Sequence, residues 1–177
     1  MSFFSRRLNL YEIVDEDTNE YYTAQSIERL NKIVKTEKIK RLTVLKTPEY
    51  IGDNFLFGCN RLRTIEFARP VQQIEFLGEN FLAECRNLRT VHWYDLLSQI
   101  TWIQRGFLSC CEKLEEIDLS SLDSVECIHG EFLFRCESLK SIDLKPLSNV
   151  TDIGGTFLEE CTGLENVDYR PLGDVIF

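Results

Sequence analysis

The sequence lacks an apolar run long enough to cross a membrane, which takes about 18 or more residues. The first residues also lack the continuous apolar segment of a secretory signal, and acidic residues soon follow Arg6 and Arg7. We therefore expect no membrane span and a location in the reducing interior of the cell, the cytoplasm. An organelle or surface location stays open, because Arg6 and Arg7 stand among apolar residues and Asn149 begins a glycosylation sequon.

An excess of positive charge is absent as well, since the formal net charge is −9. Residues 1–89 carry 14 basic and 13 acidic side chains, whereas residues 90–177 carry 6 and 16. The basic residues of the first half gather near its predicted strands: Lys38, Lys40, Arg41, Arg61, Arg63, Arg86 and Arg89. Nucleic acid binding depends on a concentrated positive field, and acidic residues interrupt this group. The composition therefore argues against nucleic acid as a partner.

The sequence also lacks a set of residues with catalytic or metal-binding spacing. His92 and His129 fall at different offsets, and Cys127 is too close to His129 for a typical zinc pair. No glycine-rich loop for binding phosphate is present. We therefore predict no enzymatic activity, no catalytic residue, no cofactor and no metal. Cys110, beside Cys111, is the best candidate for a reactive thiol.

What the sequence does contain is one block that recurs five times. Each copy starts with Phe-Leu and continues with Cys, Leu, Ile or Val and a large apolar residue at fixed offsets. The leading residues are 26, 26, 25 and 25 positions apart: Phe55, Phe81, Phe107, Phe132 and Phe157. A period of this length is typical of a solenoid, in which each repeat packs on its neighbours.

Each block combines two local patterns. The alternation in Leu139-x-x-Ile142-x-Leu144 predicts a short strand, and stacked units then give a parallel sheet. The spacing in Phe-Leu-x-x-Cys predicts a single helical or 3₁₀ turn on the opposite side. We expect Phe107, Leu114, Ile117, Leu119 and their equivalents to be buried.

Five of the seven Cys residues occupy one repeat position: Cys59, Cys85, Cys111, Cys136 and Cys161. We interpret them as a column of buried thiols that pack as small apolar side chains. The total is odd, whereas secreted proteins tend to pair their cysteines. The cysteine pattern therefore favours a reducing compartment.

The arrangement F-L-x-x-C-x-x-L-x-x-I-D-L, then P-L-x-x-V-x-x-I-G, resembles the BspA-like class of leucine-rich repeats over about residues 39–177. The resemblance implies an α/β solenoid with short parallel strands on one face and short helical or 3₁₀ turns on the other. It also implies recognition of other macromolecules through the repeat surface. It implies no reaction and supplies no catalytic residues.

The two ends of the chain differ from the repeats. We interpret residues 1–38 as an N-terminal cap, with a hairpin from Leu8–Val14 and Glu20–Thr23 followed by a helix over Ser26–Val34. Residues 39–177 form the solenoid, with one abbreviated unit and five units of 25–26 residues. No comparable cap is evident at Val175-Ile176-Phe177, so we expect end-to-end contact or self-association there.

The strand position after the buried Ile or Val is predicted to point outward. In successive units it reads Glu66, His92, Asp118, Asp143 and Asp168. Neighbouring strands lie about 4.8 Å apart, so the aspartates would repel one another and a basic partner would relieve this. The alternative is that Ile-Asp-Leu is simply the repeat consensus, with its charges screened by water.

One unit is longer than the later ones and carries both Trp residues. Its extra residue is either a bulge filled by larger side chains or a source of aromatic anchors for a partner. On the second interpretation Trp93, Tyr94 and Trp102 join the outward column as partner-binding residues.

Together these patterns predict a non-enzymatic protein–protein interaction module, a scaffold or adaptor, that binds a partner protein through the sheet face. The alternative is a structural subunit of a larger complex or homo-oligomer that assembles through the C-terminal end.

Overall fold

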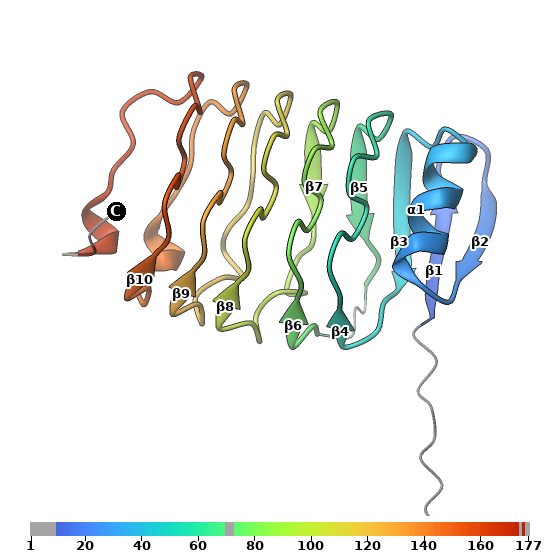
Figure 1. Cartoon of the computed structure of the whole chain (residues 1–177), viewed down its shortest axis with the longest axis horizontal. Helices are drawn as coiled ribbons and strands as arrows, with labels where there is room; N and C mark the ends of the chain where they lie inside the picture. The colour runs from blue at the N-terminus through green and yellow to red at the C-terminus, as the bar shows by residue number, and fades with distance from the viewer. Residues whose placement is uncertain (1–9, 70–72, 174, 176–177) are drawn as a thin grey trace, which may run out of the picture.

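The repeats stack side by side as the coils of one elongated solenoid (Figure 1). This computed structural model describes residues 10–69, 73–173 and 175. The sequence-based predictions for Arg6, Arg7, Leu8, Ile176 and Phe177 fall outside these residues. No helix in the described ranges combines the length and the apolar character of a membrane span.

The first coil is preceded by a hairpin and a helix. Strands β1 (Tyr11–Asp15) and β2 (Glu20–Ala24) pair antiparallel. The Asp15 carboxylate closes their turn by accepting the Asp17 N–H at 3.0 Å and the Thr18 hydroxyl at 3.1 Å. Helix α1 (Ile27–Thr36) begins after Ser26, whose hydroxyl accepts the Arg29 N–H.

Helix α1 contacts the first repeat through both packing and hydrogen bonds. Leu30, Ile33 and Val34 are its buried residues. The Asn31 side chain donates to the Asn54 carbonyl oxygen and accepts the Leu56 N–H, both at 2.8 Å. In the later coils the N–H groups that correspond to Leu56 N–H donate to carbonyl oxygens of the preceding coil. The Asn31 amide therefore supplies the acceptor that a preceding coil would supply.

The hairpin continues the main sheet of the solenoid. Strands β3 (Arg41–Lys46), β5 (Thr64–Phe67) and β7 (Thr90–His92) pair parallel, and β1 adds antiparallel to β3. The resulting order is β2-β1-β3-β5-β7. Leu42, Ile65 and Val91 lie in register and are buried, as the alternation predicts.

The equivalent segments of the later coils form no paired strand within the described ranges. The predicted parallel sheet along the whole solenoid is therefore present only as far as β7 on this side. Phe107, Leu114 and Leu119 are buried as expected, but Ile117 is only half-buried. Ile117 lies beside a groove that separates its segment from β7.

A second row of two-residue strands runs along the lower edge in Figure 1. Strand β4 (Tyr50–Ile51) pairs parallel with β6 (Phe76–Leu77), and β8 (Trp102–Ile103), β9 (Cys127–Ile128) and β10 (Asp152–Ile153) form the neighbouring sheet. Contacts between β6 and β8 join the two sheets. In every strand of this row the second residue is buried.

The Phe-Leu-x-x-Cys segment is not the helical turn that its spacing predicts. Alternate residues of each copy have positive φ, including Leu56 (55°), Leu82 (57°) and Leu108 (54°). Their backbones bond between coils, as in the Leu82 N–H to Phe55 carbonyl bond of 2.9 Å. The 3₁₀ turns, η1 (Lys145–Leu147) and η2 (Arg170–Leu172), follow the Ile-Asp-Leu and Val-Asp-Tyr sequences instead.

Five stacked rings form the centre of the core. The ring centroids of consecutive Phe residues lie 5.3, 5.7, 5.5 and 5.2 Å apart, with interplanar angles of 6° to 13°. The stack runs through Phe55, Phe81, Phe107, Phe132 and Phe157. A repeated aromatic at a fixed offset therefore becomes a continuous column through the solenoid.

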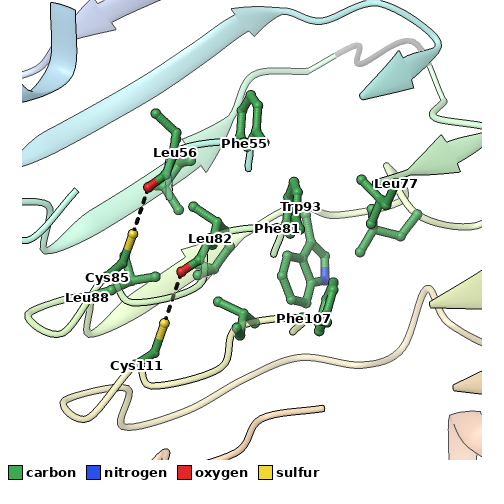
Figure 2. Close-up of a cluster of buried hydrophobic side chains, with 14 of the residues drawn as sticks. Phe55, Leu56, Leu77, Phe81, Leu82, Cys85, Leu88, Trp93, Phe107 and Cys111 are labelled. Carbon is green, nitrogen blue, oxygen red and sulfur yellow. Dashed lines mark hydrogen bonds between the residues drawn. The ribbon is translucent and has the colours of Figure 1, made fainter. Parts of the chain in front are cut away.

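The cysteine column runs beside the ring stack. All seven cysteines are free thiols, and the five at the repeat position are buried. Cys85 Sγ donates to the Leu56 carbonyl oxygen at 3.1 Å, and Cys111 Sγ to that of Leu82 at 3.3 Å, as Figure 2 shows. Cys136 and Cys161 make the same bond to Leu108 and Leu133, so four of the thiols fill core space and also satisfy a carbonyl oxygen in the turn of the coil before them.

Candidate functional site

The sheet face is the outward side of β3, β5 and β7 and of the equivalent segments 116–118, 141–143 and 166–168. The five outward residues predicted to contact a partner lie along it and are called the contact column: Glu66, His92, Asp118, Asp143 and Asp168. Glu66 and His92 are paired in register across β5 and β7, and Glu66 is half-buried. His92, Asp118, Asp143 and Asp168 are exposed. The side chains that could meet a partner on this face are thus mainly acidic.

Each of the three aspartates also has a structural role. Their carboxylates accept the backbone N–H two residues later, at 2.9 Å for Asp118, 3.0 Å for Asp143 and 3.1 Å for Asp168. This local bond begins a turn at the end of each extended segment. The Ile-Asp-Leu consensus therefore has a reason in the fold that is independent of any partner.

Asp168 differs from the other two because it has a basic partner. Both of its oxygens accept from the Arg170 guanidinium at 2.8 Å. Hydrogen bonds from the Arg170 side chain and backbone lower the pKa of Asp168 to about 2. At this end of the column the expected like-charge repulsion is therefore offset within the chain.

A groove of about 270 Å³ interrupts the sheet face beyond β7. Its lining comes from two neighbouring coils: Thr90, Val91, His92, Glu116, Ile117 and Asp118. His92 and the carboxylates of Glu116 and Asp118 give the groove a polar, mainly acidic wall. It is the hollowed part of the predicted contact column.

Trp93 follows His92 at the edge of this groove, but its side chain lies in the core. Its side chain is only 1% exposed, and its ring centroid is 5.7 Å from that of Phe107. The indole N–H donates to the Asp118 carbonyl oxygen at 2.8 Å, which occupies a backbone acceptor of the next coil. Equivalent positions hold smaller side chains, Phe67 and Leu119. Trp93 is therefore a large core residue, and no partner can contact it on the surface.

Tyr94 is half-buried and fixed by its neighbours on the sheet face. Its hydroxyl donates to Glu66 at 3.0 Å, and the Arg69 guanidinium lies 3.9 Å from the ring centroid. The hydrogen bond to Glu66 raises the pKa of Tyr94. The three side chains form one connected group on the sheet face.

Trp102 lies on another surface, in the second row of strands. Its side chain is 55% exposed, and Tyr50 (57%) and Phe76 (39%) occupy the equivalent positions of β4 and β6. Sequence reasoning singled out Trp102 alone. The signal for the other two was available, because each aromatic directly precedes the buried residue of its strand.

The basic residues near the first strands are partly neutralised by acidic neighbours. Arg86 lies 3.4 Å from Glu112 and 3.7 Å from Glu84, and Arg89 forms an ion pair with Glu115. Arg41 lies 3.9 Å from Asp17. Such pairs reduce the concentrated positive potential on which phosphate binding depends.

The cysteines and histidines do not form a metal centre in the part of the chain that the structure describes. Burial raises the pKa of Cys59 to about 12 and raises those of Cys85 and Cys111 above the usual range. Column thiols in this state are poor nucleophiles. Cys110 is half-buried, and its side chain is excluded from the column that Cys111 occupies.

Comparisons with known proteins agree on the repeat class. The model of the BspA type leucine rich repeat region matches residues 49–173 with six copies. A leucine rich cell surface protein from Faecalibacterium prausnitzii A2-165 shares 21% identity with a TM-score of 0.53, over 73% of this chain and 32% of that one. A leucine rich repeat protein of T. pallidum shares 16% identity with a TM-score of 0.50, over 73% and 64%. No curated protein matches the chain.

At these identities the two structures show a common fold, and the chain spans less than two thirds of either neighbour. The family match covers well over half of the chain. The protein is therefore a member of the BspA type leucine rich repeat family.

Proposed function

We propose that this chain is a non-enzymatic interaction module, an adaptor or scaffold, that binds a partner protein through its sheet face. Members of repeat families generally act by presenting extended surfaces to other macromolecules. The observation that carries the proposal is the groove beyond β7, where His92, Glu116 and Asp118 surround a hollow open to a partner side chain.

The proposed contacts are the exposed members of the column and the fixed group next to it. They comprise Glu66, His92, Tyr94, Asp118, Asp143 and Asp168. The negative charge supports a partner with a basic surface. Trp93 is left out because it is buried.

The aspartates require a substitution that separates charge from turn formation. Lys at these positions would remove both the negative charge and the acceptor for the backbone N–H. Asn removes the charge but keeps a side-chain oxygen that accepts the same bond. The combined variant Asp118→Asn, Asp143→Asn, Asp168→Asn therefore tests binding with the fold preserved.

The test compares proteins that co-purify with the tagged wild type and with this triple variant, quantified by mass spectrometry. We expect at least one partner to be lost from the variant while its thermal unfolding stays close to that of the wild type. An identical set of partners would contradict the sheet face as the binding surface.

A second candidate is assembly through the last repeat. Leu164 is half-buried there, whereas its equivalents Leu114 and Leu139 are fully buried. Partly covered apolar side chains favour a contact with another copy or a partner. Light scattering at increasing concentration tests this, and a constant monomer mass would argue against it.

We also propose a reducing compartment for the chain. The support is the column of five buried free thiols, of which Cys85, Cys111, Cys136 and Cys161 hydrogen bond to carbonyl oxygens rather than pair as disulfides. The F. prausnitzii neighbour is described as a cell surface protein, so location is tested directly by fractionation of the native cell.

A further inference from the structure

Three exposed aromatic side chains form a continuous row outside the sheet face. Tyr50 and Phe76 are paired in register across β4 and β6, and Trp102 occupies the same position in the adjacent β8. The residue after each of them is buried, so strand alternation points the three rings outward. We call Tyr50, Phe76 and Trp102 the aromatic row.

Three large aromatic side chains exposed next to one another are unusual for a surface that only contacts water. Single exposed apolar residues are common, but neighbouring large ones typically mark an interaction surface. Aromatic side chains have few rotatable bonds, so little conformational entropy is lost when a partner covers them. At the end of the row the Trp102 ring packs near the His129 ring, with 6.1 Å between the ring centroids.

The charges beside the row indicate what covers it. The five two-residue strands, each taken with the residue before it and the two after it, together contain six acidic residues and one basic residue. The acidic residues are Glu49, Asp53, Glu75, Glu79, Glu126 and Asp152. The basic residue, Arg105, forms an ion pair with Glu131. Glu75 accepts the Tyr50 hydroxyl at 2.6 Å, which places a carboxylate beside a ring of the row.

We propose that the aromatic row is a docking surface for an extended, basic segment of a protein. Guanidinium groups stack on aromatic rings and pair with carboxylates, and this row offers both partners side by side. Arg side chains of the segment lie over Phe76 and Trp102, and their charge is met by Glu75, Glu126 and Asp152. This surface is formed by strands β4, β6 and β8–β10, so it operates independently of the sheet face.

The test uses a fluorescein-labelled peptide of alternating Arg and Ser, with a Glu-for-Arg peptide as the control. Binding to the whole chain is measured by fluorescence anisotropy. We expect Trp102→Ala and Phe76→Ala each to weaken Arg-peptide binding about tenfold or more, although neither changes the net charge. Glu126→Gln, which removes one flanking charge, is expected to weaken it and to reduce its dependence on salt.

A matched control separates the row from exposed aromatics in general. Tyr21 is 75% exposed and lies on β2 in the hairpin, so Tyr21→Ala is expected to leave peptide binding unchanged. Equal binding by the Trp102→Ala variant and the wild type would overturn the proposal, since the peptide would then respond only to net charge.

Two further outcomes distinguish this surface from others. The triple Asn variant of the sheet face is expected to keep the Trp102-dependent part of the peptide binding, and a loss of that part would place the basic segment on the sheet face. A soluble β-glucan is the second probe, because exposed aromatic rings also stack on sugars. Glucan binding that requires Trp102, without binding of the Arg peptide, would replace the proposal with a carbohydrate site.

Discussion

At the residue scale, one side chain joins the N-terminal helix to the repeats. The Leu82, Leu108 and Leu133 N–H groups each donate to a carbonyl oxygen of the preceding coil. Leu56 belongs to the first such turn, and its N–H donates to Asn31. The Asn31 side-chain amide therefore offers a donor and an acceptor to the first coil, as a backbone peptide group of a preceding coil would.

Removing this amide is expected to destabilise the protein. Asn31→Leu leaves the Leu56 N–H without its acceptor, and an unsatisfied buried donor costs about 1–3 kcal/mol. Asn31→Asp retains the acceptor but loses the donor, so its loss should be smaller. Urea unfolding measures both, with the neighbouring exposed Lys32→Ala as the control. A free energy of unfolding for Asn31→Leu within error of the wild type would contradict this role.

The ionisation of Asp168 gives a second residue-scale prediction. Arg170 lowers the pKa of this carboxyl to about 2. A lowered pKa in the folded state adds stability above the unfolded value of 3.8, and this contribution is lost as the pH falls toward 2. NMR titration of the carboxyl should give a midpoint near 2, and Arg170→Met should move it toward 3.8. A midpoint that does not change in Arg170→Met would contradict the pairing.

At the element scale, the turn before each column cysteine explains why sequence reasoning erred there. Apolar spacing indicates a helical turn, because one helical turn brings those side chains together. The turn reaches the same side-chain arrangement with alternating positive φ values, and its N–H groups bond to adjacent coils instead of to itself. Leu and Glu rarely adopt positive φ, so the residue types in this segment do not predict its backbone conformation.

Positive φ also predicts the effect of one glycine substitution. Gly58 has φ of 63°, a conformation that costs a residue with a Cβ about 1–2 kcal/mol. Its equivalents Glu84 and Arg135 carry side chains, so Gly58→Ala should fold and lose about 1 kcal/mol. Gly52→Ala is the control and should stay within about 0.5 kcal/mol, because φ is not positive there and an added Cβ would meet Ile27 Cδ1 at 3.6 Å, an ordinary van der Waals contact. Equal unfolding midpoints for the two variants would contradict the strain.

The cysteine column is an element whose chemistry can be tested directly. Burial raises the pKa of Cys59, Cys85 and Cys111, so their thiolate fraction near pH 8 is small. A thiol reagent should therefore label these three column cysteines only on unfolding and react first with Cys110 or Cys127. Mass spectrometry of the labelled native protein identifies the sites. Rapid labelling of Cys85 in the native protein would show that the reagent reaches the column, which would contradict its burial.

At the scale of the whole molecule, the repeat period was the strongest signal in the sequence. It predicted the solenoid and most of the buried positions, because side chains at the same offset in successive coils usually share one environment. Ile117 is the exception, since it is half-buried where Ile65 and Val91 are buried. The burial of Trp93 could have been read in the same way, because Trp93 stands at the same offset from its leading Phe as the buried Phe67 and Leu119. The aromatic row was missed because its members are far apart in sequence and their strands have two residues each.

The ring stack predicts how stability is distributed along the solenoid. Phe132 is fully buried between Phe107 and Phe157, so Phe132→Ala should cost about 3–5 kcal/mol. Because each coil contacts only its neighbours, hydrogen exchange should rise most in the coils after this residue. Leu45→Ala, at an exposed position, is the control. A negligible change in the free energy of unfolding would count against the stack.

The groove beyond β7 also has a mechanical consequence. The two coils that it separates on the sheet face remain joined at the turn, through the Asn80, Glu84 and Leu108 N–H groups. One edge of this junction therefore resists stretching, while the described residues of the opposite edge are held by a single backbone bond, from the Glu115 N–H to the Arg89 carbonyl oxygen, and by the Trp93 indole bond to Asp118. Bending of the solenoid is expected to concentrate at this junction, with the turns as the pivot. A partner seated in the groove would fix the angle between the two halves of the molecule.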